Sequence, residues 1–264
     1  MTPVRLIGLP TDSNSSYLRG AARAPALIRS QLWSDHGNGA AESGLEIGSD
    51  IDLRDAGDLE LSETAADDAL ITAAVTAALA AGEAPLLLGG DHSVSAPILA
   101  AIAARYGPVD ILHFDAHPDL YEDFDGNSRS HASPFARIME AGHARRLVQV
   151  GIRTLNAHCR AQAKRYGVEI VPMRNFRALD MPPLAGPVYI SLDLDGLDPA
   201  FAPGVSHPEP GGLSVREVLD IIDNIRAPVV GADIVEYNPD RDLNMITAVV
   251  AAKFVKELAA VLAR

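Results

Sequence analysis

Short apolar runs recur along the whole chain, separated by longer segments of mixed polarity. The runs are rich in Leu, Ile and Val and are followed by Gly, Pro or polar residues, which is the pattern of buried strands. The predicted strands cover residues 4–9, 84–90, 110–115, 146–152, 168–173, 187–195 and 228–237.

The segments between these runs are rich in Ala and have helical spacing. The predicted helices cover residues 62–82, 95–107, 132–142, 157–167, 214–226 and 244–263. Two stretches, residues 34–50 and 121–131, are too polar for core elements and are predicted to be surface loops. The alternation of strand and helix predicts a single α/β domain over residues 1–264, with three layers and a mainly parallel sheet in the middle.

Composition narrows the class of protein. The chain has 264 residues, 48% of them hydrophobic and 22% charged, as in ordinary globular enzymes. A net charge of −13 and the lack of a dense Lys/Arg cluster argue against nucleic acid as a partner. The single cysteine, Cys159, excludes an internal disulfide and fits a reducing compartment. The start of the chain does not resemble a secretory signal, and no apolar run reaches the roughly 18 residues that cross a bilayer, so we expect a cytoplasmic protein without a membrane partner.

Metal-binding and acidic residues follow four of the predicted strands. In an open α/β sheet, ligands bind beyond the carboxyl ends of the strands, so we expect these side chains to meet at one edge. They are His92, Asp115, His117, Asp119, Asp193, Asp195 and Glu236. Because side chains alternate along a strand, Asp115 and His117 share a face, as do Asp193 and Asp195.

The charge of this group predicts its cofactor. Without a cation the four aspartates would repel one another, and some would have to take up protons. Their roughly four negative charges are balanced by two divalent ions, with the two histidines binding as neutral imidazoles. Mixed carboxylate and imidazole ligands suit Mn²⁺ better than structural Zn²⁺. We therefore expect two Mn²⁺ ions per subunit, which together activate a water molecule.

Single residues of this kind have simpler interpretations. Asp91 or Asp198, each placed after a strand, is interpreted as a helix cap when it is taken alone. A lone histidine is more often a core or surface residue than a ligand. A phosphate-binding role for Gly89 and Gly90 is weakly supported, because no further phosphate-binding motif follows them.

Three motifs in order resemble the metal signatures of the ureohydrolases, the family of arginase, agmatinase and formiminoglutamase. They are GGDHS (89–93), FDAHPDLY (114–121) and SLDLDGLDPAFAPG (191–204). The resemblance begins at residue 8 and continues through ADIVEYNPDRD (232–242), so it covers nearly the whole chain. It implies an arginase-like fold and a homo-oligomer, either a trimer or a hexamer.

The resemblance also implies a role for each site residue. One Mn²⁺ would be held by His92, Asp115, Asp119 and Asp193, and the other by Asp115, His117, Asp193 and Asp195. Asp115 and Asp193 would bridge the two ions and so take part in catalysis. His131 stands where relatives carry a histidine that moves protons, although Ala132 replaces their usual glycine. Glu236 would grip a planar guanidinium and orient its carbon for attack.

Substrate preference follows from smaller differences. Tyr121 and PEPGGL (208–213) resemble agmatinases, and GIRTLNAHCR (151–160) lacks the acidic residue that arginase directs at the substrate's α-amino group. His207 would line the pocket and alter which substrate fits. We expect hydrolysis of a linear guanidino compound to urea and an amine, with a slight preference for an agmatine-like substrate. Alternatives within the family are N-formimino-glutamate, arginine and N-hydroxyarginine.

Two other classes of protein are alternatives to this interpretation. A deacetylase-like enzyme with a single zinc needs one Asp-x-His and one further Asp, so Asp119 and Asp195 argue against it. A non-catalytic binding protein on the same scaffold would be expected to have lost some ligands, whereas all six are present.

Overall fold

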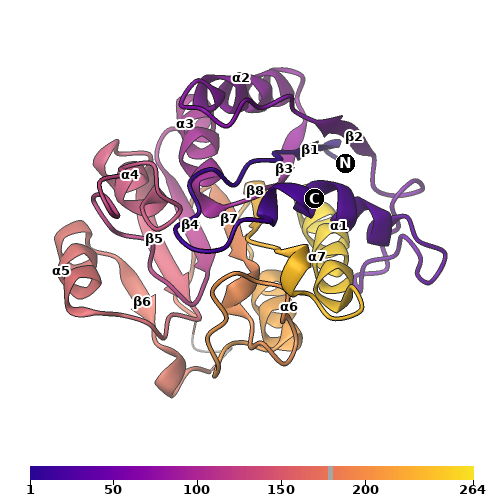
Figure 1. Ribbon diagram of the computed structural model, residues 1–264. Coiled ribbons are helices and arrows are strands. Elements are labelled where there is room, and N and C mark those ends of the chain that lie inside the picture. Colours follow the sequence, from indigo (N-terminus) through magenta and orange to yellow (C-terminus); the bar gives the residue numbers. More distant parts are fainter. Residues whose placement is uncertain (178–180) are drawn as a thin grey trace.

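A parallel sheet forms the centre of the computed structural model, which describes residues 1–177 and 181–264 (Figure 1). Within those residues the sheet has eight strands in the order β2-β1-β3-β8-β7-β4-β5-β6, and every neighbouring pair is parallel. The strands are β1 (Val4–Gly8), β2 (Leu53–Asp58), β3 (Ala84–Leu88), β4 (Val109–Phe114), β5 (Ala144–Val150), β6 (Glu169–Val171), β7 (Val188–Asp193) and β8 (Val229–Val235).

Helices cover both faces of the sheet, which confirms the predicted three layers (Figure 1). They are α1 (Ala24–Leu32), α2 (Asp67–Ala80), α3 (Ser95–Tyr106), α4 (Pro134–Glu140), α5 (Ala157–Tyr166), α6 (Val215–Asp223) and α7 (Ile246–Leu262). One apolar cluster joins the sheet to α1, α6 and α7, and another joins it to α2, α3 and α4. Strand β3 shows the alternation, because Leu86 and Leu88 belong to the first cluster and Leu87 to the second.

Two elements are absent from the sequence prediction. Strand β2 has the sequence LRDAGD, which lacks alternating apolar residues and is mostly exposed. It forms because β1 pairs with it and because Arg29 binds Asp55 and Asp58 in ion pairs. Helix α1 has Pro25 in its first turn and buries Ile28 and Leu32, which is a standard helical signal.

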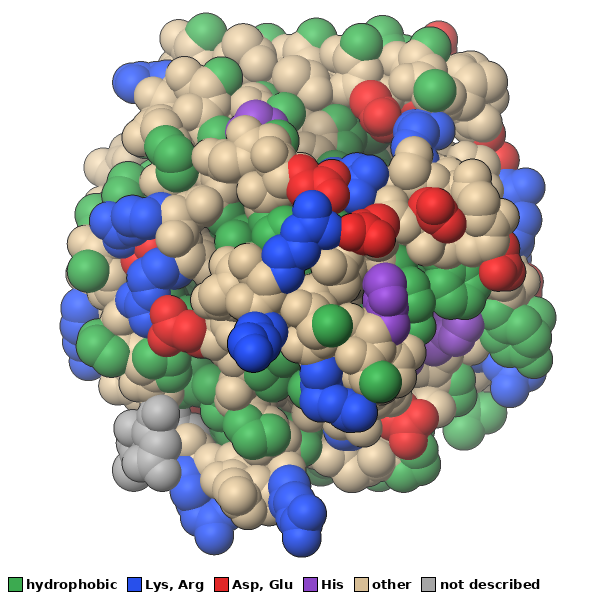
Figure 2. Space-filling view, turned by 90° about the vertical axis from the view of Figure 1, so that its left-hand side faces the viewer, with side chains coloured by type: hydrophobic (Ala, Val, Ile, Leu, Met, Phe, Trp, Pro, Cys, Tyr) green, Lys and Arg blue, Asp and Glu red, His purple; other side chains and the backbone are tan. Residues whose placement is uncertain are grey.

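The other predicted elements are confirmed, with small differences at their ends. Helix α2 starts at Asp67 rather than Ser62, because the Asp67 carboxylate accepts the main-chain N–H groups of Ser62 and Thr64 and holds them in a turn. Residues 34–50 and 121–131 lie largely outside regular elements, as predicted. No helix in the described part of the chain is both long and apolar enough to span a bilayer. Acidic and basic side chains are interspersed on the side that carries α4 and α5 (Figure 2).

The order of the central strands positions the site. Strands β3, β8, β7 and β4 are consecutive neighbours in the sheet. Their registers align the last residues, since Phe114 lies beside Leu192 and Leu192 lies beside Ile234. The residues that follow these strands therefore emerge together at one edge, as a parallel sheet requires.

Candidate metal centre

The first group of ligand atoms surrounds His92. Its Nδ1 atom lies 3.3 Å from Oδ2 of Asp115, 3.2 Å from Oδ2 of Asp119 and 3.1 Å from Oδ2 of Asp193. All four residues are buried. Within the described chain, His92 Nδ1 makes no hydrogen bond, although it is fully enclosed. A buried ring nitrogen facing three carboxylate oxygens fits a cation between them.

Hydrogen bonds behind His92 fix its tautomer. Ser191 donates its hydroxyl proton to Asp233 Oδ1 at 2.7 Å. Its oxygen, 2.9 Å from His92 Nε2, therefore accepts the proton that Nε2 carries. Nδ1 is left with its lone pair, as a metal ligand requires, and outer hydrogen bonds of this kind are typical of metal sites.

The second group surrounds His117. Its Nδ1 atom lies 3.0 Å from Oδ2 of Asp195 and 3.4 Å from Oδ1 of Asp115. Asp115 thus gives one oxygen to each group. Asp193 places Oδ2 in the first group, while its Oδ1 accepts the main-chain N–H of Asp195 at 2.7 Å, so a bridging role for Asp193 stays a prediction. The structure brings all six predicted ligands together.

Without a cation, bound protons offset the negative charge of the candidate ligands. Burial, together with the charges of Asp195 and Asp115, raises the pKa of Asp193 well above its usual value. Burial raises the pKa of Asp195 to about 6. Burial lowers the pKa of His117, but Asp195 and Asp115 outweigh this effect and raise it to about 12. The pKa of His92 is likewise raised by its carboxylate neighbours, against burial. Cations would replace these protons.

The main chain is strained at two of the predicted site residues. Asp119 has φ 49° and Glu236 has φ 66°, which lie in the left-handed region that residues with side chains rarely adopt. Gly90 lies close by, and a Cβ atom there would fall 1.8 Å from the carbonyl oxygen of Thr11. The carbonyl of Gly90 accepts the main-chain N–H of Glu236 at 2.8 Å. Gly90 thus allows its segment to pack closely against Thr11, where a side chain would not fit.

Of the two aspartates interpreted as helix caps, Asp91 caps a short helix as predicted, whereas Asp198 caps none of the described helices. Asp91 accepts the main-chain N–H groups of Asn14 and Ser93 at the start of a short 3-10 helix. Asp198 accepts three main-chain N–H groups, those of Ala200, Gly211 and Gly212. Neither carboxylate belongs to the two ligand groups.

His131 and Glu236 form a buried pair beside the ligands. His131 Nδ1 lies 2.8 Å from Glu236 Oε1, which also accepts the main-chain N–H of His92 at 2.8 Å. Burial lowers the pKa of His131, but the charge of Glu236 outweighs it and raises the pKa to about 9. The main-chain N–H of Ser16 points at His131 Nε2 at 3.1 Å and favours the neutral ring. Proton uptake at Nε2 therefore requires Ser16 to turn away.

A cavity of about 290 Å³ opens onto these groups. Tyr121 lines it, accepts a hydrogen bond from Asn156 Nδ2 at 2.6 Å and stacks on the ring of His158. The main-chain N–H of Tyr121 donates to the carbonyl of Ala132, so the residue that departs from the family pattern supports Tyr121.

His207 lies between His131 and His117. Its ring centre is 5.3 Å from that of His131 and 5.9 Å from that of His117. Its Nε2 atom is buried and has no hydrogen-bond partner in the described chain. Burial lowers the pKa of His207, so the ring is neutral near pH 7. Both Tyr121 and His207 line the cavity, as the sequence predicts.

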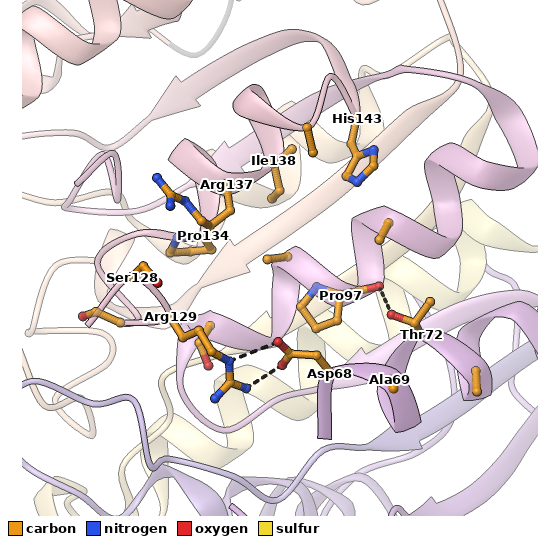
Figure 3. Close-up of a pocket in the computed structure, with 16 residues that line it drawn as sticks. Asp68, Ala69, Thr72, Pro97, Ser128, Arg129, Pro134, Arg137, Ile138 and His143 are labelled. Carbon is orange, nitrogen blue, oxygen red and sulfur yellow. Dashed lines mark hydrogen bonds and ion pairs between the residues drawn. The ribbon is translucent and has the colours of Figure 1, made fainter. Parts of the chain in front are cut away.

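A larger cavity, of about 590 Å³, lies between α2, α3 and α4 (Figure 3). Alanine side chains form much of its wall, and none of the six ligands lines it. At its edge Arg129 binds Asp68 through two hydrogen bonds of 3.0 and 2.6 Å. This pair joins the loop before His131 to α2. The candidate chemistry belongs to the smaller cavity, where the titratable groups converge.

Sequence reasoning missed several residues that support the candidate ligands or the wall of the cavity. They are His113, Gln149, Ser191, Asp233 and Asn156. One signal was available, because His113 lies two residues before Asp115 on β4 and therefore faces the same side. The remaining contacts depend on which strands become neighbours, which one sequence does not reveal.

Comparisons with known proteins agree with this geometry. The model of the arginase family matches residues 2–260. Arginase 1 of Arabidopsis thaliana, a mitochondrial protein, is 51% identical over 97% of this chain and 80% of its own length. The agmatinase of Bacillus anthracis is 36% identical over 97% of this chain and 90% of its own. The structure of an arginase from Medicago truncatula superposes with a TM-score of 0.94 at 45% identity, covering 99% of this chain and 87% of the other. This chain belongs to the arginase family and is a hydrolase that acts on guanidino C–N bonds.

Proposed function

We propose that this chain uses two Mn²⁺ ions to hydrolyse L-arginine to urea and L-ornithine, and that residues 1–264 form a single catalytic domain. The observation that carries the proposal is the convergence of two ligand groups that share Asp115 beside Glu236. Two groups favour two ions over the single zinc of a deacetylase-like enzyme. The ligand chemistry, carboxylate oxygen with imidazole nitrogen, suits Mn²⁺.

The residues of the chain divide the chemical tasks. When bound, two divalent ions lower the pKa of a water molecule toward neutrality. Glu236 is buried and its pKa is lowered by the charge of His131 and by hydrogen bonds, against burial, so it is ionised and suited to a guanidinium. Once Ser16 turns away from Nε2, His131 can take up a proton there and give it to the leaving amine, which must be protonated as the C–N bond breaks.

The outer part of the cavity supports arginine over agmatine. The comparisons support ureohydrolase activity but not the slight agmatine preference drawn from the sequence, since the plant relatives at about half identity are named arginases. Among the described lining residues, the only carboxylates are three candidate ligands and Glu236. The ammonium group of arginine or of agmatine would lack a carboxylate partner there, so the preference rests on the carboxylate that only arginine has. The Tyr121 hydroxyl accepts from Asn156, so its own proton is available to the carboxylate of arginine.

A urea-release assay tests the proposal. The Mn²⁺-loaded protein is given arginine, agmatine, 4-guanidinobutyrate or N-hydroxyarginine, and formamide is measured with N-formimino-glutamate. We expect kcat/KM to be highest for arginine, by at least about tenfold over agmatine, since one charge-assisted hydrogen bond contributes about 1.5–3 kcal/mol. A higher kcat/KM for agmatine, or formamide release without urea, would replace arginine as the substrate.

A pair of tyrosine variants tests the outer contact. Tyr121→Phe should raise KM for arginine and leave KM for agmatine nearly unchanged, because only arginine has a carboxylate for the hydroxyl to bind. Tyr17→Phe is the matched control, since Tyr17 is exposed and contacts His207 through its tilted ring, with ring centres 5.6 Å apart. Equal effects of Tyr121→Phe on both substrates would contradict this contact.

Assembly and location stay predictions. The expected trimer or hexamer is tested by light scattering coupled to size-exclusion chromatography. The expected cytoplasmic location is tested by fractionation of the source cells, and the plant relatives named mitochondrial or chloroplastic make that test necessary.

A further inference from the structure

His113 is held rigidly beside the candidate metal centre. It lies on β4, two residues before Asp115, and is completely buried. Its ring stacks on Phe135, with centres 3.9 Å apart and planes at 29°, and meets the edge of His92 at 5.0 Å. The ring therefore has no room to turn, and its two nitrogen atoms keep fixed partners.

Gln149 on β5 sets the tautomer of His113. The amide nitrogen of Gln149 lies 2.6 Å from the carbonyl oxygen of Pro118 and 3.0 Å from His113 Nδ1. A carbonyl only accepts, so the amide nitrogen must face Pro118 and donate to it. The same nitrogen then donates to Nδ1, which leaves the ring proton of His113 on Nε2. The carbonyl oxygen of Gln149 is buried without a partner in the described chain, so this orientation is kept despite one unmet hydrogen bond.

The proton on His113 Nε2 reaches the carboxylate that both ligand groups share. Nε2 lies 2.9 Å from Asp115 Oδ2, the oxygen that faces His92. The other oxygen, Oδ1, accepts the main-chain N–H of His117 at 2.5 Å. One donor on each oxygen fixes the plane of the carboxylate, so that Oδ2 faces the first group and Oδ1 faces the second.

We propose that His113 and Gln149 form a positioning pair that orients Asp115 for two metal ions at once, without His113 being a ligand itself. The inference rests on the proposed dinuclear function. His113 lies within ligand distance of the first group, together with His92 and Asp115. Neither nitrogen of His113 has a lone pair free for a metal ion, because Nε2 carries the proton and the lone pair of Nδ1 accepts a hydrogen bond from Gln149. A metal ligand needs a free lone pair, as His92 has.

Variants of His113 test the pair through Mn²⁺ binding, measured by calorimetry and elemental analysis without substrate. His113→Phe keeps the stacking on Phe135 and removes the donor, and should weaken Mn²⁺ binding about 10–100-fold, as loss of an outer hydrogen bond does. His113→Gln places an amide N–H near the position of Nε2 and should recover most of the affinity. Gln149→Leu should weaken binding less, and the double variant with His113→Phe should be no weaker than His113→Phe alone, since both changes act through one contact.

A control and three outcomes make the test decisive. Ser133→Ala removes a buried hydroxyl that has no partner in the described chain and should leave Mn²⁺ affinity unchanged. Unchanged affinity in His113→Phe overturns the inference. Loss of one whole ion in His113→Phe, without recovery in His113→Gln, also overturns it and makes His113 a ligand. Failure of the unaltered protein to bind two ions refutes the dinuclear function instead, so the two failures are distinguishable. Circular dichroism of each metal-free variant verifies folding, and His113→Gln keeps the test valid if His113→Phe does not fold.

Discussion

Loading the site with metal should release protons. His117 holds a proton near neutral pH in the metal-free state, because its carboxylate neighbours raise its pKa to about 12, and the raised pKa values of His92 and Asp193 favour protons at those residues too. Metal ligands must be deprotonated to bind. Binding of both ions at pH 8 should therefore release at least the proton of His117, which is about one proton per subunit.

The number released should rise as the pH falls. Asp195 has a pKa of about 6, so it is nearly fully ionised at pH 8 and about half protonated at pH 6. Binding at pH 6 should therefore release about half a proton more than binding at pH 8. Mn²⁺ affinity should fall over the same interval, because the ions compete with more protons.

Calorimetric titration with Mn²⁺ in buffers of different ionisation enthalpy measures this number as the slope of binding enthalpy against buffer enthalpy. His207→Asn is the control, because the pKa of His207 is lowered and the ring holds no proton to release near pH 8. It should leave the slope unchanged, whereas His117→Asn should reduce it by about one. A slope near zero at pH 8 would refute the reasoning, since the crowded carboxylates would then be tolerated without protons.

Three further variants test separate parts of the site. Asp193→Asn should abolish turnover and weaken Mn²⁺ binding, and retained activity with full metal content in elemental analysis would contradict its role as a ligand. Glu236→Gln should keep both ions but lower kcat/KM about 10–100-fold, because a neutral amide binds a guanidinium less strongly. Loss of metal in this variant would contradict the role of Glu236 in binding substrate rather than metal. Asp68→Asn should lower the free energy of unfolding by less than about 1 kcal/mol, since its partner Arg129 is partly exposed, and a larger loss in urea unfolding would give this pair a structural role.

The strands were predictable where burial dominates their sequence. Runs such as APLLL in β3 and VYISLD in β7 are buried along their whole length, so their apolar residues identify them. Strand β2 has no such run, because it lies at the sheet edge and its residues mostly face solvent. Its formation depends on pairing with β1 and on the ion pairs of Arg29, which are tertiary contacts. Local pattern therefore reveals central strands better than edge strands.

The candidate site was predictable for a related reason. A parallel sheet brings the carboxyl ends of its strands to one edge, so Asp115 and Asp193 had to emerge there together. The roles of Asp233 and His113 were not predicted, because both residues lie inside strands. An isolated polar residue within an apolar run only interrupts the hydrophobic pattern and does not indicate a partner. Their partners come from other strands, Ser191 for Asp233 and Gln149 for His113. These partners depend on the order of the strands in the sheet, and the sequence of a single segment does not predict that order.

The strained residues show how the fold and the site depend on each other. Left-handed backbone at Asp119 and Glu236 costs about 1–3 kcal/mol at each position. At Glu236 the cost is offset locally, because its N–H donates to Gly90 and its carboxylate accepts the N–H of His92. Gly90 reaches this position only because it lacks a Cβ atom and can lie against Thr11. Gly90, which was weighed above as a phosphate-binding residue, thus helps to hold the backbone of Glu236 in a strained conformation. The segment around Gly90 and the segment around Glu236 therefore act as one structural unit.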